Sequence, residues 1–373
     1  WLKCAEHLSS AQRCPKPLSY SSPLCCVGVI LSGTPGSHRA MQSAGEVDNA
    51  LRVGPVTVAD AAPLFPPDKH AFLGDLQGEP SELKLLSFNL GLLRLKLAGV
   101  TVKDSPPHVS ERFEHIPAAL ASCGADLIFL QEIYEERHVR AVLAAAGPAG
   151  YTHHARGDTR SNKLLQFHNG LLVLSKVPID AAQVLLHEQC SSLEKTFGSK
   201  SCLAVRVSTC VGKLCFVNMH TTAGGGDDPE ANDVDTARES ELREAVALCA
   251  QAACNGYAGV VVGDLNCGPE ASSGNYEWLK QRGFSDALAP FNLGCTWDPS
   301  SPLNNLAVFA ECPPQRIDHI FLPEQLIAGA GALMCVTTAE RCFTEAPVLL
   351  RNGKAVTLSD HYGVRATLRR VSA

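Results

Sequence analysis

Gly259–Gly268 reads GVVVGDLNCG, and the interpretation of the whole chain starts from this stretch. Three valines between glycines predict a short strand that is buried on both faces. The strand leads into Asp264 and Asn266, which point the same way on extended backbone and can share one ligand. If this were the only such pattern, a simple turn would explain it, because Asp and Asn are common turn formers.

Three other apolar segments run into polar side chains in the same manner. The polar residues are Asn89, after residues 83–88; Glu132, after residues 127–130; and His220, after residues 214–217. The ends of neighbouring strands gather at one rim of a sheet, where open α/β sheets place their binding sites. Four such endings in one chain therefore predict a single polar site.

The composition describes a chain that can bury a large core. It has 373 residues, of which 45% are hydrophobic and 19% charged, so one domain of about 290 residues beside a leader is expected. The net charge of −6 disfavours a protein held mainly by nucleic-acid phosphates. No apolar run is long enough to span a membrane.

The 16 cysteines form no Cys-x-x-Cys pair, so a zinc site is disfavoured and buried, reduced thiols are expected. The chain also contains no Asn-x-Ser/Thr sequon. Both features favour a cytoplasmic or peripheral-membrane location.

Residues 1–80 are rich in Pro, Ser, Gly and Ala and show little periodicity, which predicts a flexible leader or a targeting segment. Residues 81–373 are predicted to form the folded domain. Many strands with few helices between them favour two packed sheets with helices outside.

Local patterns predict three details of this domain. Pro117 is expected to kink or shorten a helix that Ser110 could cap. A capping box at Thr236–Glu239 predicts the start of another helix. Asn352-Gly353 predicts a hairpin with a type I′ turn within residues 348–358.

The polar residues together suit metal-assisted phosphoester hydrolysis. The set is Asn89, Glu132, His220, Asp264, Asn266, Asp318, Asp360 and His361. Oxygen ligands without cysteine suit Mg²⁺, with Mn²⁺ as the alternative ion, and Mg²⁺ commonly binds through one or two carboxylates plus substrate phosphate. In such sites water attacks phosphorus in line while the metal neutralises charge on the phosphoryl oxygens.

Histidine is the natural proton acceptor at neutral pH, which makes His361 the candidate general base. The carboxylate of Asp318 is expected to orient its ring, and His220 is expected to stabilise developing charge or to aid the leaving oxygen. His319 is interpreted as a hydrogen-bonded structural residue.

Six ordered motifs resemble the signature blocks of the endonuclease/exonuclease/phosphatase superfamily. They are LSFN (86–89), LQE (130–132), NGL (169–171), GDLN (263–266), RIDHIF (316–321) and SDH (359–361). The resemblance covers about residues 81–370. It implies the deoxyribonuclease I-like fold, a four-layer α/β/β/α sandwich of two mainly antiparallel sheets flanked by helices.

Within that superfamily the chain is most similar to the neutral sphingomyelinases. The resemblance implies a Mg²⁺-dependent phosphodiesterase that acts at a membrane surface and releases phosphocholine and ceramide. It would make Glu132 the central metal ligand, with Asn89 beside it and Asp360 supporting the metal region. It would place Asp264 and Asn266 against the scissile phosphate and its metal.

Some positions depart from the subfamily pattern and bear on the substrate. Ser201 stands where a glycine is expected, and the hairpin tip Arg351–Lys354 is polar and cationic, where bacterial relatives carry a membrane-contacting hairpin. The alternatives are a nuclease or a phosphoinositide phosphatase of the same fold, or an inactive scaffold module. The complete polar set disfavours the scaffold.

Overall fold

The computed structural model describes residues 46–47, 51–53, 63–74, 82–97, 100–157, 168–187, 189, 200–224, 231–306, 312–329 and 331–371. The chain divides into two compact units, residues 1–44 and 45–373, and all described residues belong to the second. Strands β1 (Glu46–Val47) and β2 (Leu51–Val53) and helix α2 (Lys69–Leu73) lie within the stretch predicted as a leader, and they join this folded unit. The role of residues 1–44 stays a prediction.

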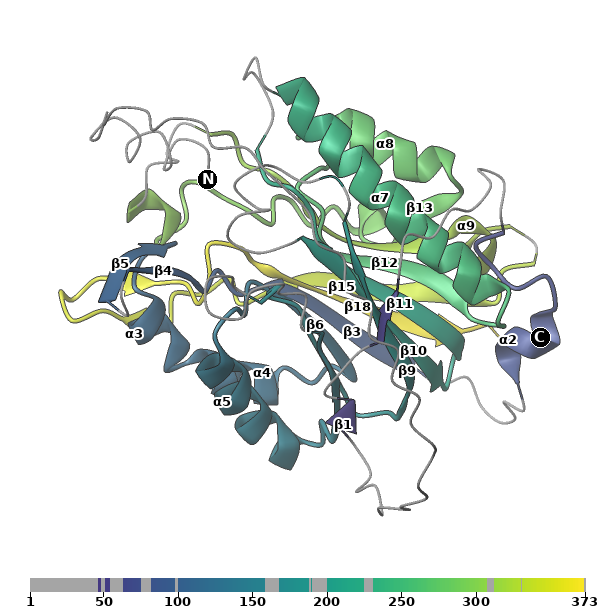
Figure 1. Ribbon diagram of the computed structural model, residues 1–373, viewed down its shortest axis with the longest axis horizontal. Coiled ribbons are helices and arrows are strands. Elements are labelled where there is room, and N and C mark those ends of the chain that lie inside the picture. Colours follow the sequence, from purple (N-terminus) through teal and green to yellow (C-terminus); the bar gives the residue numbers. More distant parts are fainter. Residues whose placement is uncertain are drawn as a thin grey trace, which may run out of the picture. The chain divides into compact units, whose positions relative to one another are not determined.

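Two seven-stranded sheets form the centre of the described part of the chain (Figure 1). In spatial order, the first sheet contains β1, β7 (His153–Ala155), β8 (Leu172–Ser175), β6 (Leu127–Gln131), β3 (Glu82–Asn89), β18 (Gly363–Arg370) and β15 (Met334–Cys342). The second contains β13 (Phe284–Asp286), β14 (Asp318–Pro323), β12 (Ala258–Asp264), β11 (Gly212–His220), β10 (Ser201–Thr209), β9 (Ile179–Leu186) and β2. Parallel and antiparallel pairs both occur, so each sheet is mixed.

Helices and two small hairpins complete the domain. The helices are α3 (Val109–Phe113), α4 (Ile116–Ser122), α5 (Glu136–Ala146), α7 (Ala231–Ala253), α8 (Ser273–Gln281) and α9 (Glu324–Ile327), with short 3₁₀ turns η1 (Gly147–Ala149), η2 (Ala289–Phe291) and η3 (Asn304–Leu306). The hairpins pair β4 (Leu93–Leu97) with β5 (Val100–Ser105) and β16 (Val348–Leu349) with β17 (Ala355–Val356).

The alternation of side chains along each strand produces three apolar layers. Leu85, Phe129 and Val260 belong to the core that contains inward-facing side chains of both sheets. Their sequence neighbours face the helices instead, as Ile128 does toward α5 and Val261 toward α7. The predicted four-layer α/β/β/α sandwich is therefore confirmed, with sheets that are mixed in strand direction.

The inward face of each sheet turns from apolar to polar toward one end. Ser87, Gln131 and Asn218 lie two residues beyond inward-facing apolar residues and are buried. The Gln131 amide donates to Ser87 Oγ (3.3 Å) and Asn218 Oδ1 (2.8 Å), so a hydrogen-bonded layer joins the two sheets. The next inward-facing residues on β3 and β11 are Asn89 and His220, which places the site directly beyond this layer.

One expected helix start is wrong and one helix interruption is confirmed. Helix α7 begins at Ala231, so Thr236 lies inside the helix and opens no capping box. Tertiary contacts override the local pattern there, because the buried Arg238 donates to the carbonyl oxygens of Thr222 and Gly224. Pro117 stands in the first turn of α4, after a break from α3.

The second hairpin exists, but its turn is not type I′. Residues 350–354 separate β16 from β17, and within this described turn only Gly353 has a positive φ (81°). The Gly353 N–H donates to the carbonyl of Leu350, and the Leu350 N–H donates to that of Lys354. A four-residue turn that ends in a left-handed glycine fits the twist of a hairpin as well as the shorter Asn-Gly turn does.

Described cysteines carry free thiols, among them the buried Cys202, Cys215, Cys249 and Cys267. No helix in the described part of the chain is long and apolar enough to cross a membrane.

A buried ion cluster fixes the start of β14. Asp286 accepts hydrogen bonds from Arg316, from His319 Nδ1 (3.1 Å) and from the Tyr276 hydroxyl (3.1 Å). His319 also contacts the carbonyl of Cys267, at 2.9 Å, and is fully buried, which agrees with its structural interpretation. Burial acts to raise the pKa of Asp286, but the charges of and hydrogen bonds from His319 and Arg316 hold it well below its usual range.

We predict that Asp286→Asn destabilises the fold by about 3–5 kcal/mol at pH 7, because it leaves a buried cationic cluster without its carboxylate. A depressed pKa in the folded state means that this stabilisation is complete above the unfolded pKa of about 3.9 and is lost as the pH falls below it. Urea unfolding at pH 7 and pH 3 should show a difference between wild type and variant that shrinks at pH 3. An equal difference at both pH values would contradict this assignment.

We also predict that Gly263→Ala destabilises the protein by about 1–3 kcal/mol or more. A Cβ at Gly263 would lie 2.0 Å from the Met219 carbonyl oxygen on the paired strand, and the φ of 137° is rarely adopted by other residues. Gly147→Ala is the matched control, since its Cβ would meet no atom within 4 Å, and we expect a gain of about 0.4–1 kcal/mol. Thermal unfolding of both variants measures the contrast.

Candidate active site

Strand register brings the polar residues of the second sheet together. His220 pairs with Asp264 across the parallel strands β11 and β12, and Asp264 pairs with Asp318 across the antiparallel strands β12 and β14. All three side chains are buried. On the first sheet, β3 and β6 end side by side at Asn89 and Gln131, and Glu132 follows.

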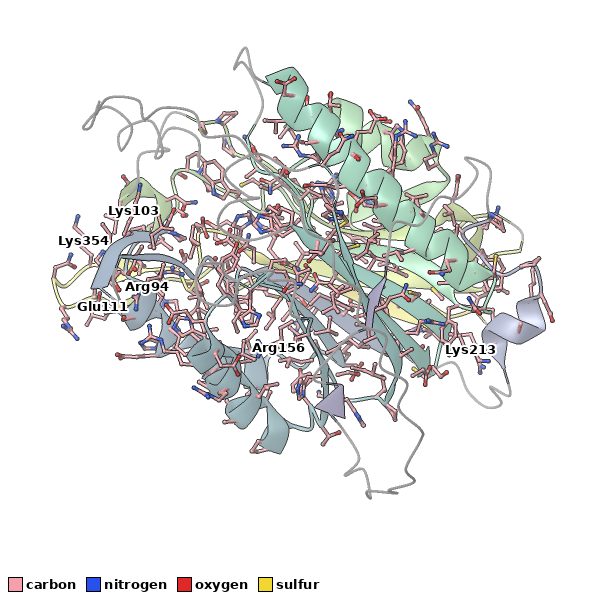
Figure 2. All side chains as sticks on the ribbon, viewed as in Figure 1. Arg94, Lys103, Glu111, Arg156, Lys213 and Lys354 are labelled. Atoms are coloured by element: carbon pink, nitrogen blue, oxygen red, sulfur yellow. The ribbon has the colours of Figure 1, made fainter. Side chains whose placement is uncertain are left out.

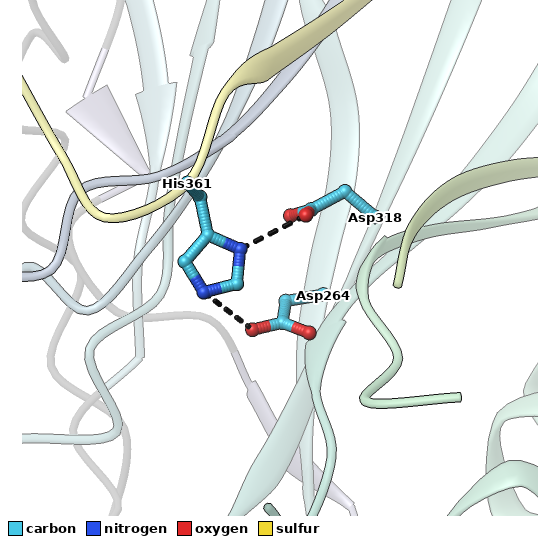
Figure 3. A group of neighbouring side chains, drawn as sticks. All are labelled: Asp264, Asp318 and His361. Carbon is cyan, nitrogen blue, oxygen red and sulfur yellow. Dashed lines mark hydrogen bonds and ion pairs between the residues drawn. The ribbon is translucent and has the colours of Figure 1, made fainter. Parts of the chain in front are cut away.

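His361 lies between two carboxylates (Figure 3). Its Nδ1 is 2.9 Å from Asp318 Oδ2, and its Nε2 is 3.7 Å from Asp264 Oδ2. The shorter contact assigns the proton on Nδ1 to the bond with Asp318, which leaves Nε2 to exchange a proton on the side of Asp264. Asp318 is itself fixed, because the Thr296 hydroxyl oxygen accepts hydrogen bonds from its backbone N–H and from that of Ile317.

The two carboxylates control the charge of His361. Burial acts to lower the pKa of His361, but the charges of Asp318 and Asp264 and the hydrogen bond to Asp318 raise it well above its usual range. The two carboxylates therefore favour the protonated form of the imidazole. Asp264, Asp318 and His361 also offer one ligand atom each within 4.8 Å of one another, a spacing that a metal ion could use.

Glu132 occupies a strained position, and 14% of its side chain is exposed. It has a φ of 56°, in the left-handed region that residues other than glycine rarely adopt. The next residue, Ile133, donates its N–H to the carbonyl of Gly170, and a Cβ at Gly170 would lie 2.7 Å from the Tyr134 ring. Burial and the repulsion of the Asp360 carboxylate raise the pKa of Glu132 to about 7.

Asn89 connects the two sheets at the site. Its Nδ2 donates to Asp264 Oδ2 (2.9 Å) and lies 3.5 Å from Glu132 Oε1. Its Oδ1 accepts the N–H of Gly91 at 3.0 Å. Asn89 thus holds the carboxylates of Glu132 and Asp264, one from each sheet, around a common point.

His220 faces the same point from the second sheet. Its Nε2 is 3.6 Å from Asp264 Oδ2 and 3.9 Å from Glu132 Oε1. Burial and the charge of Lys200 lower the pKa of His220 to about 3, so its ring is neutral at pH 7. A neutral imidazole can donate a hydrogen bond to an oxygen that gains negative charge.

Asn266 and Asp360 lie at the edges of this group. Asn266 has a φ of 45°, its N–H donates to Asp264 Oδ1 (3.0 Å), and its Nδ2 donates to the carbonyl of Thr221 (3.1 Å). Asp360 Oδ1 accepts the Ser359 hydroxyl at 3.0 Å, and the same hydroxyl contacts the Asn89 carbonyl at 2.7 Å. Every predicted site residue therefore belongs to one connected region at the strand ends.

A family model described as the endonuclease/exonuclease/phosphatase family matches residues 86–361, a range that begins in β3 and ends at His361. The chain belongs to this family. No curated protein sequence shows significant similarity to it.

Solved structures of family members show the same fold. Sphingomyelinase C from Streptomyces griseocarneus is 20% identical and covers 77% of this chain and 99% of its own, with a TM-score of 0.58. A beta toxin from Staphylococcus aureus with bound magnesium ions is 17% identical over 77% of this chain and 99% of its own, with a TM-score of 0.59. TDP2 from D. rerio, complexed with a single-strand DNA product, is 21% identical with the same coverages and a TM-score of 0.53.

As a member of this family the chain is expected to hydrolyse phosphoesters. The structure also shows contacts of residues to which the sequence motifs assigned no role. Ser87, Gln131 and Asn218 form the polar layer between the site and the apolar core. They occupy inward-facing positions in the two-residue alternation of apolar strands, and this pattern could have identified them. Thr296 lies in a segment with no regular pattern. Arg112, on the short helix α3, is fully buried and gave no signal at all.

We predict that Asp318→Asn lowers the pKa of His361 by about 1–3 pH units, because the imidazolium loses the carboxylate that stabilises its charge. The asparagine oxygen can still accept the Nδ1 hydrogen bond, so the ring position should change little. NMR titration of histidine ring signals in the presence of EDTA measures the effect. Asp180→Asn, on the exposed part of β9, is the control and should leave His361 unchanged; an unaltered His361 titration in Asp318→Asn would exclude the carboxylate as its charge partner.

Proposed function

We propose that this protein is a Mg²⁺-dependent phosphodiesterase that hydrolyses sphingomyelin or a related choline phospholipid to phosphocholine and ceramide. The observation that carries the reaction is the Asp318–His361–Asp264 arrangement beside Glu132. An imidazole that can exchange a proton lies next to several carboxylate and amide oxygens that can bind a metal, which is the arrangement that phosphoester hydrolysis by water requires.

The metal is proposed to bind at Glu132, with Asn89 and Asp360 nearby. Hard carboxylate and amide oxygens without sulfur suit Mg²⁺. The residues fit a cation, because two carboxylates repel each other in a buried place and the pKa of Glu132 rises in consequence. When bound, Mg²⁺ supplies positive charge that neutralises phosphoryl oxygens and favours the neutral form of His361.

His361 is proposed as the general base. Asp318 fixes its ring through Nδ1, so Nε2 is the atom that accepts the proton of the attacking water. Asp318 Oδ1 is buried and has no hydrogen-bond partner among the described residues. This leaves the second carboxylate oxygen free to balance charge when the imidazole becomes protonated.

His220 and Asn266 are proposed to contact the phosphoryl group, and Asp264 is proposed to contact it together with its metal. The neutral His220 ring can donate to a phosphoryl oxygen as its negative charge develops. Asp264 Oδ2 contacts Asn89 and both site histidines, His220 and His361, so these three side chains converge on one carboxylate oxygen. Asn266 is held by the Thr221 carbonyl close to this centre.

Two hairpins support a lipid surface as the place of action. Val102 on β5 is 62% exposed and Leu349 on β16 is 71% exposed, so each hairpin presents one large apolar side chain at the surface. Both hairpins contact α3, through the Arg94–Ser110 hydrogen bond and through Glu111, which accepts the Arg351 N–H. Figure 2 shows Arg94, Lys103, Glu111 and Lys354 together at this end of the molecule.

These hairpins extend from the strand ends that form the site. Strand β4 begins four residues after Asn89, and β17 ends five residues before His361. Exposed apolar groups beside the lysines 103 and 354 suit the boundary between lipid headgroups and acyl chains. A nuclease of the same fold is the second candidate, because the TDP2 structure holds a DNA product.

We predict that the full 373-residue chain releases phosphocholine from sphingomyelin vesicles in Mg²⁺ and that EDTA abolishes the release. His361→Ala should lower kcat by about 10²–10⁴-fold, the usual contribution of a positioned acid–base group. His115→Ala, at an exposed histidine before α4, is the matched control and should retain activity. Phosphocholine is measured directly in the aqueous phase.

Release that needs both the metal and His361 would support the reaction and the substrate together. Hydrolysis of single-stranded DNA without phosphocholine release would favour the nuclease. Full activity of His361→Ala would contradict the proposed base, whichever substrate is cleaved.

A further inference from the structure

The proposed reaction assigns no role to Arg112, which lies beside the site. It is fully buried, and all of its hydrogen bonds among the described residues go to backbone carbonyl oxygens. Arg238, the other large and fully buried arginine, instead pairs with a carboxylate, Asp235, at 2.6 Å. Burying a guanidinium without a bonded carboxylate costs free energy. We therefore expect the contacts of Arg112 to provide a compensating benefit.

The carbonyls that Arg112 contacts lie on either side of the site. Its Nη1 donates to Leu90 (3.2 Å) and to Leu358 (2.7 Å), and its Nη2 donates to Gly91. Leu90 and Gly91 directly follow Asn89, and Leu358 precedes the Ser359-Asp360-His361 segment. One planar group therefore bridges the segment that carries Asn89 and the segment that carries Asp360 and His361.

The third set of contacts fixes the guanidinium itself. Its Nε donates to the Pro107 carbonyl at 3.0 Å, and Nη2 lies 3.5 Å from that of Pro106. These prolines precede α3, the helix that carries Arg112. The guanidinium is thus held at Nε, while Nη1 and Nη2 reach the two site segments. The flexible ammonium group of a lysine could not reproduce this arrangement.

The two bridged segments touch where they meet. A Cβ at Gly91, whose φ is 55°, would lie 2.3 Å from Asp360 Oδ1. The Ser359 hydroxyl contacts the Asn89 carbonyl across the same gap. A small change in the separation of these segments would therefore move the Asp360 carboxylate relative to Asn89 and Glu132. The positive charge of Arg112 also faces Asp360 and Glu132, whose like charges oppose each other.

We propose that Arg112 is a positioning residue that holds the Asn89 and Asp360 segments at the one separation at which their oxygens and those of Glu132 can bind a divalent cation. This rests on the metal-dependent function proposed above. Arg112 touches neither the reacting atoms nor the metal ligands' side chains through its hydrogen bonds; it acts through the backbone that carries them.

The test compares Arg112→Lys with wild type in the full chain. Lysine keeps the positive charge, but its single nitrogen has three donors and cannot reproduce the five carbonyl contacts that the planar guanidinium makes. We expect Mg²⁺ affinity, measured by calorimetry without substrate, to fall about 10–100-fold, as is typical when outer contacts of a metal site are lost. At saturating Mg²⁺ we expect kcat for phosphocholine release to fall at least about 10-fold, with little change in KM.

The matched control is Leu248→Ala, which removes a buried side chain of α7 from the core on the outer face of the second sheet. It should lower Tm while leaving Mg²⁺ affinity and kcat at wild-type values. Wild-type Mg²⁺ affinity and kcat in a folded Arg112→Lys protein would overturn the proposal. Equal losses of affinity in Leu248→Ala would also overturn it, because general destabilisation would then explain the effect.

If Arg112→Lys does not fold, Gly91→Ala decides the question, since its Cβ would press directly on Asp360. We expect it to weaken Mg²⁺ binding, and wild-type affinity would overturn the proposal. The proposed function fails separately: a wild-type chain that binds Mg²⁺ but cleaves no phosphoester refutes that function while the affinities still decide the role of Arg112. A wild-type chain that binds no Mg²⁺ overturns both.

Discussion

The pairing of β11 with β12, and of β12 with β14, is the constraint on which the site depends. It places His220, Asp264 and Asp318 in one row across the second sheet, so their side chains meet without any further adjustment. The first sheet adds Asn89 and Glu132 from the ends of β3 and β6. A polar layer of Ser87, Gln131 and Asn218 separates this group from the apolar core, which keeps the site charges away from aliphatic side chains.

Electrostatics divides the site into two parts with different tasks. The carboxylates of Asp318 and Asp264 favour positive charge on His361, whereas burial and Lys200 keep His220 neutral. Two histidines that face the same aspartate thus receive opposite charge states from their surroundings. Glu132 is held differently, because burial and the repulsion of the Asp360 carboxylate raise its pKa.

Sequence patterns predict the features that follow from the alternation of side chains along strands and from polar residues at strand ends. This is why the amino-acid sequence alone groups Asn89, Glu132, His220 and Asp264, and why it predicts the sandwich. Contacts between distant segments produce no such pattern, as between Arg112 and Leu358, which are 246 residues apart. The capping pattern at Thr236 predicted the wrong helix start, in a region where Arg238 makes buried contacts. The prediction of a type I′ turn is wrong for a local reason, because two turn geometries suit the same glycine.

The division of the site between two sheets has a consequence for folding. Asn89 and Glu132 belong to one sheet and His220, Asp264 and Asp318 to the other, and the Asn89–Asp264 hydrogen bond crosses between them. Neither sheet alone holds a complete set of groups, so a partly folded chain with one sheet formed would be catalytically silent. Activity would then report cooperative docking of the two sheets, and premature reactivity during synthesis would be avoided by the architecture itself.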